Sequence, residues 1–142
     1  MTREQKLTRF NGVAIAAFGL IFAAGAWTPI YDLVAYYIHA AHWPYHAAPK
    51  VAGPTERLLI ATTGGLSVSL GVAIWTAAGV VWEASPDAAR RLIRYTAWTW
   101  FIVDSSFSIV AGSPMNAALN LVFLTMILLP IRRSAATRSA TA

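Results

Sequence analysis

The sequence contains no cysteine, which excludes disulfides, thiolate metal sites and thiol catalysis in this chain. Charged residues are also scarce: they make up 12% of the chain, about half of their usual share in a soluble domain, whereas hydrophobic residues make up 57%. No Gly-rich phosphate loop and no histidine–glutamate zinc motif occurs. Together with a mean hydropathy of +0.54, this composition indicates a single domain that lies in a membrane.

Four long apolar runs predict an all-α membrane protein, a bundle of four transmembrane helices. The four predicted spans cover residues 10–27, 57–82, 88–112 and 114–131. A typical spanning helix needs about 20 residues, so each run suffices with its flanks. Prolines that follow capping residues mark helix starts, as Pro29 does after Thr28. Gly112, Ser113 and Pro114 form the tightest junction, and they predict a helical hairpin between the last two spans.

Residues 29–54, between the first two spans, are predicted to stay at the outer membrane surface. Up to about His42, apolar positions alternate with Asp32 and His39, a pattern typical of a short interfacial helix. Prolines predict an irregular remainder, and the polar tail 134–142 is expected to be mobile. In an alternative interpretation, residues 1–26 are a cleaved signal peptide and three spans remain.

Lysine and arginine are distributed unevenly along the chain. The N-terminus, the connection between the second and third spans, and the C-terminal residues after the last span carry three each. The long outer connection carries two, and the last turn carries none. The positive-inside rule then predicts that both termini lie in the cytoplasm. Although the net charge is +5, the basic residues form short clusters beside apolar runs, so nucleic acid is not an expected partner.

Asp104 lies near the middle of the third span, where a carboxylate is costly enough to indicate a function. Polar side chains of three predicted helices reach the same depth. This predicted polar cluster consists of Asp104, Ser108, Asn116, Asn120, Ser67 and Ser69. In one interpretation it is a hydrogen-bonded knot that fixes helix register, each bond contributing about 1 kcal/mol. In the other, Asp104 is a proton carrier or a ligand anchor.

Small residues recur at helix-packing spacing in the first two spans. They are Gly12, Ala16, Gly19 and Ala23 in the first, and Ala61, Gly65, Ser69 and Ala73 in the second. Such stripes let helix backbones approach closely inside lipid. They predict packing within the chain, and they could equally serve a homo-oligomer or a partner subunit.

Three histidines are candidate ligands for a metal or haem: His39, His42 and His46. The first two can share a helical face, but Pro44 separates them from His46. Because the spacing fits no recognised site, no cofactor is predicted, and haem or metal binding is kept as an alternative.

Two segments carry a resemblance to known proteins. One contains TERLL (55–59) and GGL (64–66), with Gly71 and Trp75; the other contains WFIVDSS (100–106) and AGSPMNAALN (111–120). They resemble a group of small, uncharacterised four-span integral membrane proteins of proteobacteria, for which no activity is assigned. The resemblance implies a bacterial inner membrane location. It also implies that Asp104, Asn116 and Asn120 belong to a recurring pattern.

These features favour a non-enzymatic integral membrane protein. We expect an accessory or scaffold subunit of a membrane complex that works through helix contacts inside the bilayer, with lipid and a homo-oligomer or larger complex as partners. One alternative is a proton-coupled transporter of small solutes in which Asp104 is the titrating group. The other is a membrane enzyme or a haem or metal protein that uses His39 and His42.

Overall fold

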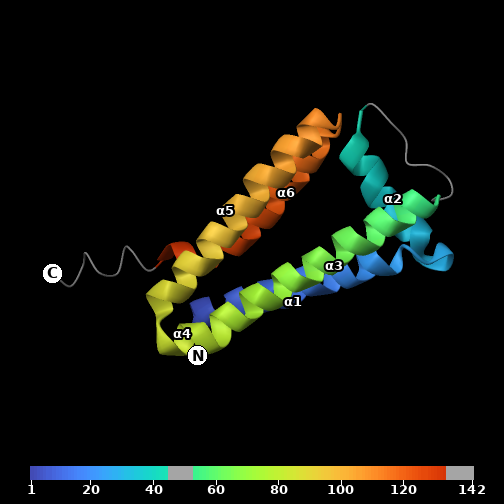
Figure 1. The fold of residues 1–142 in the computed structure, drawn as a ribbon. Helices are drawn as coiled ribbons and strands as arrows, with labels where there is room; N and C mark the ends of the chain where they lie inside the picture. Colours follow the sequence, from blue (N-terminus) through green and yellow to red (C-terminus); the bar gives the residue numbers. More distant parts are fainter. Residues whose placement is uncertain (45–52, 134–142) are drawn as a thin grey trace.

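The computed structural model describes residues 1–44 and 53–133. Within these ranges all regular structure is helical and no strand occurs, which confirms the all-α prediction (Figure 1). The long helices are α1 (Arg3–Ala24), α2 (Thr28–His42), α3 (Pro54–Thr76), α5 (Pro86–Val110) and α6 (Pro114–Leu128). The short ones are a π-helix, η1 (Ala77–Val81), then α4 (Trp82–Ala84), and a 3₁₀-helix, η2 (Pro130–Arg133). The predicted mobile tail, His46 and most of the predicted irregular segment lie outside the described residues.

The long helices form two antiparallel pairs, α1 with α3 and α5 with α6 (Figure 1). The pairs meet at the end of the molecule that holds the N-terminus, α4 and the start of α5. They separate toward the other end, where α2 lies across the opening and contacts both α6 and α1. We call these the closed end and the open end.

Two of the described helical segments are long and apolar enough to cross a membrane. They are α1 and the continuous segment Pro54–Ala84, which joins α3, η1 and α4. Helix α6 is apolar but has only 15 residues. Helix α5 is long enough, with 25 residues, but is not apolar enough. The predicted helices are therefore present, with α2 starting at Thr28 and ending at His42, while the four-span bundle itself stays a prediction.

Local signals in the sequence set the ends of α5. Ser85 precedes it, and its hydroxyl accepts a hydrogen bond from the backbone N–H of Ala88 at 3.4 Å. Gly112 follows it with φ +78°, a left-handed conformation that glycine adopts without strain, and turns the chain into α6. Ser113 takes the predicted N-cap position of α6, but its hydroxyl does not cap the helix. It lies 2.6 Å from Nδ1 of His42 instead.

Helices α1 and α3 approach closely through glycines. A Cβ added to Gly19 would lie 2.6 Å from the backbone nitrogen of Val68, and one added to Gly12 would lie 2.8 Å from the carbonyl oxygen of Gly71. Ala16 and Ala23 of α1 lie in the same interface, against Gly71 and Gly64. The whole stripe predicted on the first span therefore faces α3.

The stripe predicted on the second span does not face α1. A Cβ added to Gly65 would meet nothing within 4 Å, Ser69 and Ala73 are exposed, and Ala61 is half-buried. The glycines that contact α1 are Gly64 and Gly71. The prediction failed because α3 carries two small-residue stripes about 100° apart on the helix. Both have the spacing of a packing face, and sequence alone does not choose between them.

An ion pair joins the two helix pairs at the closed end. Nε and Nη2 of Arg90 in α5 donate to the two carboxylate oxygens of Glu4 in α1 at 2.8 and 2.9 Å, and Nη1 donates to Asp87 at 3.0 Å. The guanidinium also lies 4.6 Å from the ring centroid of Trp82, which the π-helix η1 brings into the interior. The side chains of Arg90 and Glu4 are 14% and 18% exposed, so this ion pair, which we call the clamp, is shielded from solvent more than a surface ion pair is.

The apolar core fills the closed half of the molecule. Its buried residues come from α1, α3, η1, α4, α5, α6 and η2: Ile15, Ile74, Ala77, Ala78, Trp82, Ala89, Ile93, Ala97, Leu124, Ile127 and Ile131. A second, smaller cluster forms near the open end from Phe22, Tyr31, Val34 and Ile60. The core is therefore split along the long axis of the molecule.

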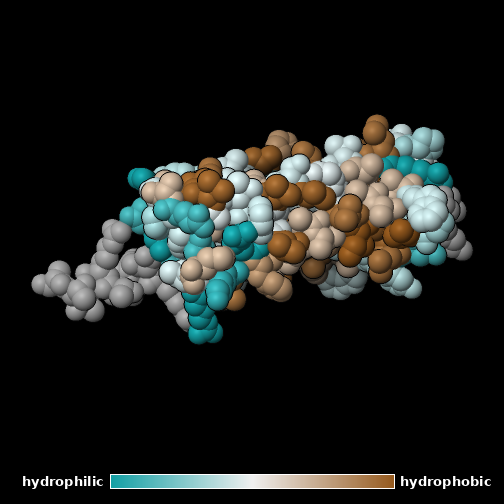
Figure 2. Space-filling model, turned by 90° about the horizontal axis from the view of Figure 1, so that it is seen from below, coloured by the Kyte–Doolittle hydropathy of each residue, from teal (hydrophilic) through white to brown (hydrophobic). Residues whose placement is uncertain are grey.

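Large apolar side chains also cover the outer surface. Phe10 and Leu20 of α1, Leu66 of α3, Phe107 of α5 and Val122 of α6 are each more than half exposed. Figure 2 shows apolar residues spread over the middle of one face, with hydrophilic ones gathered toward its ends. Soluble monomers rarely expose apolar surface on this scale, so the pattern favours contact with lipid.

Candidate ligand-binding cavity

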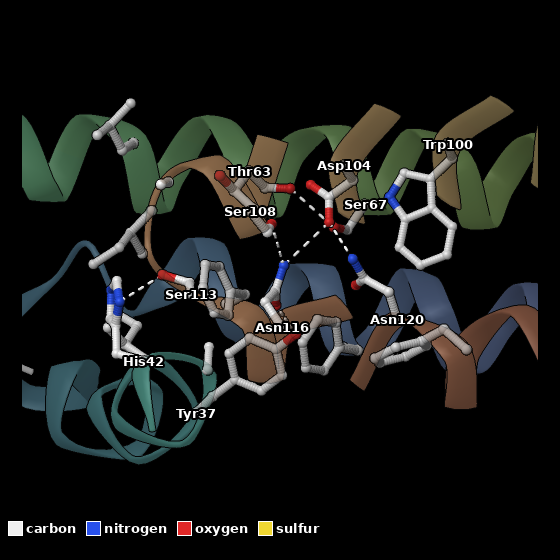
Figure 3. A pocket seen from close by; sticks show the side chains of 18 of the residues that line it. Tyr37, His42, Thr63, Ser67, Trp100, Asp104, Ser108, Ser113, Asn116 and Asn120 are labelled. Carbon is white, nitrogen blue, oxygen red and sulfur yellow. Dashed lines mark hydrogen bonds between the residues drawn. The ribbon is translucent and has the colours of Figure 1, made fainter. Parts of the chain in front are cut away.

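A cavity of about 560 Å³ lies between the two helix pairs, toward the open end (Figure 3). Its lining comes from α1, α2, α3, α5 and α6, so every long helix contributes a wall. Small-molecule sites typically measure about 300–1,000 Å³. The cavity is therefore large enough for a small solute.

Four residues of the predicted polar cluster come together on one wall of the cavity. Nδ2 of Asn116 donates to Oδ2 of Asp104 at 3.2 Å and to Oγ of Ser108 at 2.9 Å. Nδ2 of Asn120 donates to the same Oδ2 of Asp104 and, at 3.2 Å, to Oγ of Ser105. One helical turn separates the members of each pair on α5 and α6, and the hairpin at Gly112 brings the two faces together.

The other carboxylate oxygen of Asp104, Oδ1, accepts no hydrogen bond from the described residues. Asp104 is half-buried. Among all the described residues, Nε2 of Gln5 is the one fully buried side-chain polar atom without a hydrogen-bond partner. Oδ1 therefore keeps exposed area, and the cavity that Asp104 lines accounts for it (Figure 3). This oxygen can accept a hydrogen bond from a molecule in the cavity, or form an ion pair with a positive group of that molecule.

Tyr37 of α2 completes the polar wall. Its hydroxyl donates to Oδ1 of Asn116 at 3.1 Å, which leaves Nδ2 of that amide facing Asp104 and Ser108. Burial, together with the nearby carboxylate of Asp104, raises the pKa of the Tyr37 phenol to about 12. The phenol is consequently a protonated donor at neutral pH. Sequence reasoning placed Tyr37 on the interfacial helix, but no local signal indicates a partner 79 residues away.

Aromatic rings form much of the remaining wall. Phe18 lies with its ring centroid 5.1 Å from that of Phe123 and 5.3 Å from that of Tyr37, and Trp100 packs edge-on against Phe123 at 6.4 Å. Phe22 contacts Tyr37 at 5.5 Å. All five side chains line the cavity. No sequence signal singles out Phe18, Phe22, Tyr37 and Phe123 as a site, because aromatic residues are ordinary throughout apolar helices.

The two serines predicted from α3 separate. Ser67 lines the cavity, and its hydroxyl donates to the carbonyl oxygen of Thr63 at 2.9 Å. Ser69 is exposed, and its hydroxyl donates to the carbonyl oxygen of Gly65 at 3.0 Å. Residues two apart on a helix point about 200° apart, so both cannot face one cluster. Placing Ser69 in the polar cluster was therefore wrong.

The two candidate histidines within the described ranges, His39 and His42, differ in their surroundings. His39 is exposed, whereas His42 is half-buried, lines the outer end of the cavity and contacts Ser113. His46 falls outside the described ranges. Among residues 1–44 and 53–133, no group of three or more His, Asp or Glu side chains could hold a metal ion.

The charges that line the cavity are acidic. Asp104 lies inside, and Glu56 lies at the start of α3, where it is exposed. No lysine or arginine is among the described lining residues. The cavity is therefore an apolar, aromatic chamber with one polar wall and a negative electrostatic bias.

No family model, no curated protein and no solved structure matches the chain. The resemblance to small proteobacterial membrane proteins stays a prediction.

Proposed function

We propose that the chain is a four-span integral membrane protein that binds a small solute in the cavity between its helix pairs. The observation that carries this proposal is Oδ1 of Asp104, a carboxylate oxygen with no partner among the described residues, in a chamber of about 560 Å³. A carboxylate at membrane depth normally faces protein or water, and it marks substrate and ion pathways. Binding at Asp104 is also the first step that a proton-coupled solute carrier requires.

The helix lengths support four crossings. Helices α1 and Pro54–Ala84 are long and apolar enough by themselves. Helix α6 rises by about 22 Å and η2 adds about 8 Å, which together match the roughly 30 Å hydrocarbon core. In α5, Asp104 is the one charged residue after Arg94. Because α5 pairs with α6 in an antiparallel hairpin, the two would cross together.

The distribution of charge supports an orientation. Arg3, Lys6 and Arg9 begin the chain, and Arg90 and Arg91 lie in the first turns of α5. Figure 1 places both segments at the closed end. Under the positive-inside rule the closed end faces the cytoplasm, with both termini, and the open end with α2 faces outward. We propose the bacterial inner membrane as the location.

The polar wall favours solute binding over the scaffold role. The small-residue stripe of α1 is occupied by α3, at Gly12 and Gly19, whereas the stripe of α3 at Gly65 and Ser69 is open to another helix. An accessory role would leave the unpartnered oxygen of Asp104 without a purpose. The cavity gives that oxygen one.

The experiment compares two substitutions that place the same bulk on opposite faces of α3. Ser67→Phe fills the cavity, whereas Ser69→Phe adds a ring to the exposed face. Wild type and both variants are purified from their own membranes in mild detergent, and the bound small molecules are identified by mass spectrometry. We expect a solute that accompanies the wild type and Ser69→Phe but is absent from Ser67→Phe. Equal solute content in all three proteins would contradict the proposal.

A further inference from the structure

We propose that the ligand of this cavity is a small organic cation with an apolar body, its positive group placed at Oδ1 of Asp104. This inference rests on the proposed function and names the substrate class of the same site.

The hydrogen-bond pattern around Asp104 gives the first reason. Both amide donors, from Asn116 and Asn120, bind Oδ2, so the polar wall orients the carboxylate and leaves Oδ1 for another group. The described lining contains no lysine or arginine to supply that positive charge. An acidic ligand would meet like charge, whereas a positive group would be attracted to Oδ1 by its opposite charge, with or without an N–H donor.

The aromatic rings around the carboxylate give the second reason. Phe18, Phe123, Trp100 and Tyr37 line the chamber, and Tyr37 and Trp100 lie on either side of the polar wall (Figure 3). Aromatic faces attract cations within about 6 Å, and the attraction grows when the cation is desolvated. The same rings contact an apolar body without requiring a polar partner. A carboxylate next to several rings is thus suited to a cation that carries hydrocarbon.

The amide of Asn116 on the polar wall is already occupied by Tyr37 and Ser108. Helix α3 adds three further polar side chains to the lining, Glu56, Thr63 and Ser67. Most of the lining is nevertheless apolar or aromatic, so the hydrocarbon body of an organic cation fits it better than a polyol does.

The test uses benzyltrimethylammonium as the probe, with the full chain in lipid nanodiscs and empty nanodiscs as the blank. Equilibrium dialysis measures binding of the radiolabelled cation. Unlabelled benzyltrimethylammonium, its uncharged isostere neopentylbenzene, and phenylacetate serve as competitors. We expect saturable binding that the cation displaces and that the isostere and the anion displace weakly. Asp104→Asn should weaken binding by about tenfold to a hundredfold. Asp32→Asn, the same change on the exposed face of α2, should leave binding unchanged.

The outcomes separate this inference from the proposed function. If neopentylbenzene competes as well as the cation, or if folded Asp104→Asn binds as tightly as the wild type, the cation class is wrong while a solute cavity remains. The competition among three probes uses wild-type protein, so it decides the ligand class even if Asp104→Asn does not fold. If no probe binds and Ser67→Phe retains the same solutes as the wild type, both the inference and the proposed function are wrong.

Discussion

Gly64 of α3 allows a quantitative test of the packing that holds the cavity wall in place. A Cβ at this position would lie 2.6 Å from both Cα and Cβ of Ala23 in α1. Ordinary contacts between carbon atoms are about 3.5–4.0 Å long, so Gly64→Ala would force the helices about 1 Å apart. The obstructing atoms belong to backbone and a Cβ, and no side-chain rotation can relieve the contact.

The expected cost follows from two opposing effects. Overpacking of this kind costs about 1–3 kcal/mol, and the better helix propensity of alanine recovers up to about 1 kcal/mol. We therefore expect Gly64→Ala to lower the free energy of unfolding by about 1–2 kcal/mol. Gly65→Ala makes the same change one residue along, where the added Cβ meets nothing within 4 Å. It should be neutral or slightly stabilising.

Unfolding by SDS in mixed micelles, followed by far-UV circular dichroism, compares the two variants with the wild type. The difference in stability between the two variants is more informative than either value alone, because both variants carry the same chemical change in the same helix. If Gly64→Ala is as stable as the wild type, or if Gly65→Ala loses as much stability, then α3 does not pack against α1 through the Gly64 face.

Further predictions concern the clamp, the polar wall and the orientation. Arg90→Leu should lower the free energy of unfolding by about 2 kcal/mol, because it leaves a partly buried carboxylate unpaired; exposed Arg91→Leu should change it by less than about 0.5 kcal/mol in the same SDS titration. Tyr37→Phe should cost about 1 kcal/mol through its lost hydrogen bond, whereas Tyr36→Phe, at a 78% exposed position, should cost almost nothing. In spheroplasts, whose outer membrane is opened, an impermeant thiol reagent should label Asp32→Cys and external protease should spare an N-terminal tag; protection of Asp32→Cys would show the opposite orientation.

The helices and the polar wall could be predicted from sequence because their signals are local. Apolar length, Ser85 before a proline and glycine at position 112 define α5 and its turn into α6. Once that hairpin is assumed, the one-turn spacing of Asp104 and Ser108 on α5, and of Asn116 and Asn120 on α6, brings the four side chains together.

The cavity could not be predicted because it depends on how separate elements pack. Tyr37 reaches Asn116 only because α2 lies across the open end, and Glu4 meets Arg90 across 86 residues of sequence. The choice between Gly64 and Gly65 depends on the rotation of α3 about its axis. No local pattern encodes that rotation when both faces of the helix carry small residues.

A pair of single cysteines tests most directly whether an open cavity lies within the bilayer. The chain has no cysteine of its own, so Ser67→Cys and Ser69→Cys each create one thiol, at nearly the same depth on opposite faces of α3. In native membranes a small, water-soluble methanethiosulfonate should modify Ser67→Cys in the cavity and leave Ser69→Cys, which the proposed four-span arrangement places against lipid, unmodified. Rapid modification of both thiols would place α3 in water, and modification of Ser69→Cys alone would mean that the cavity lies elsewhere.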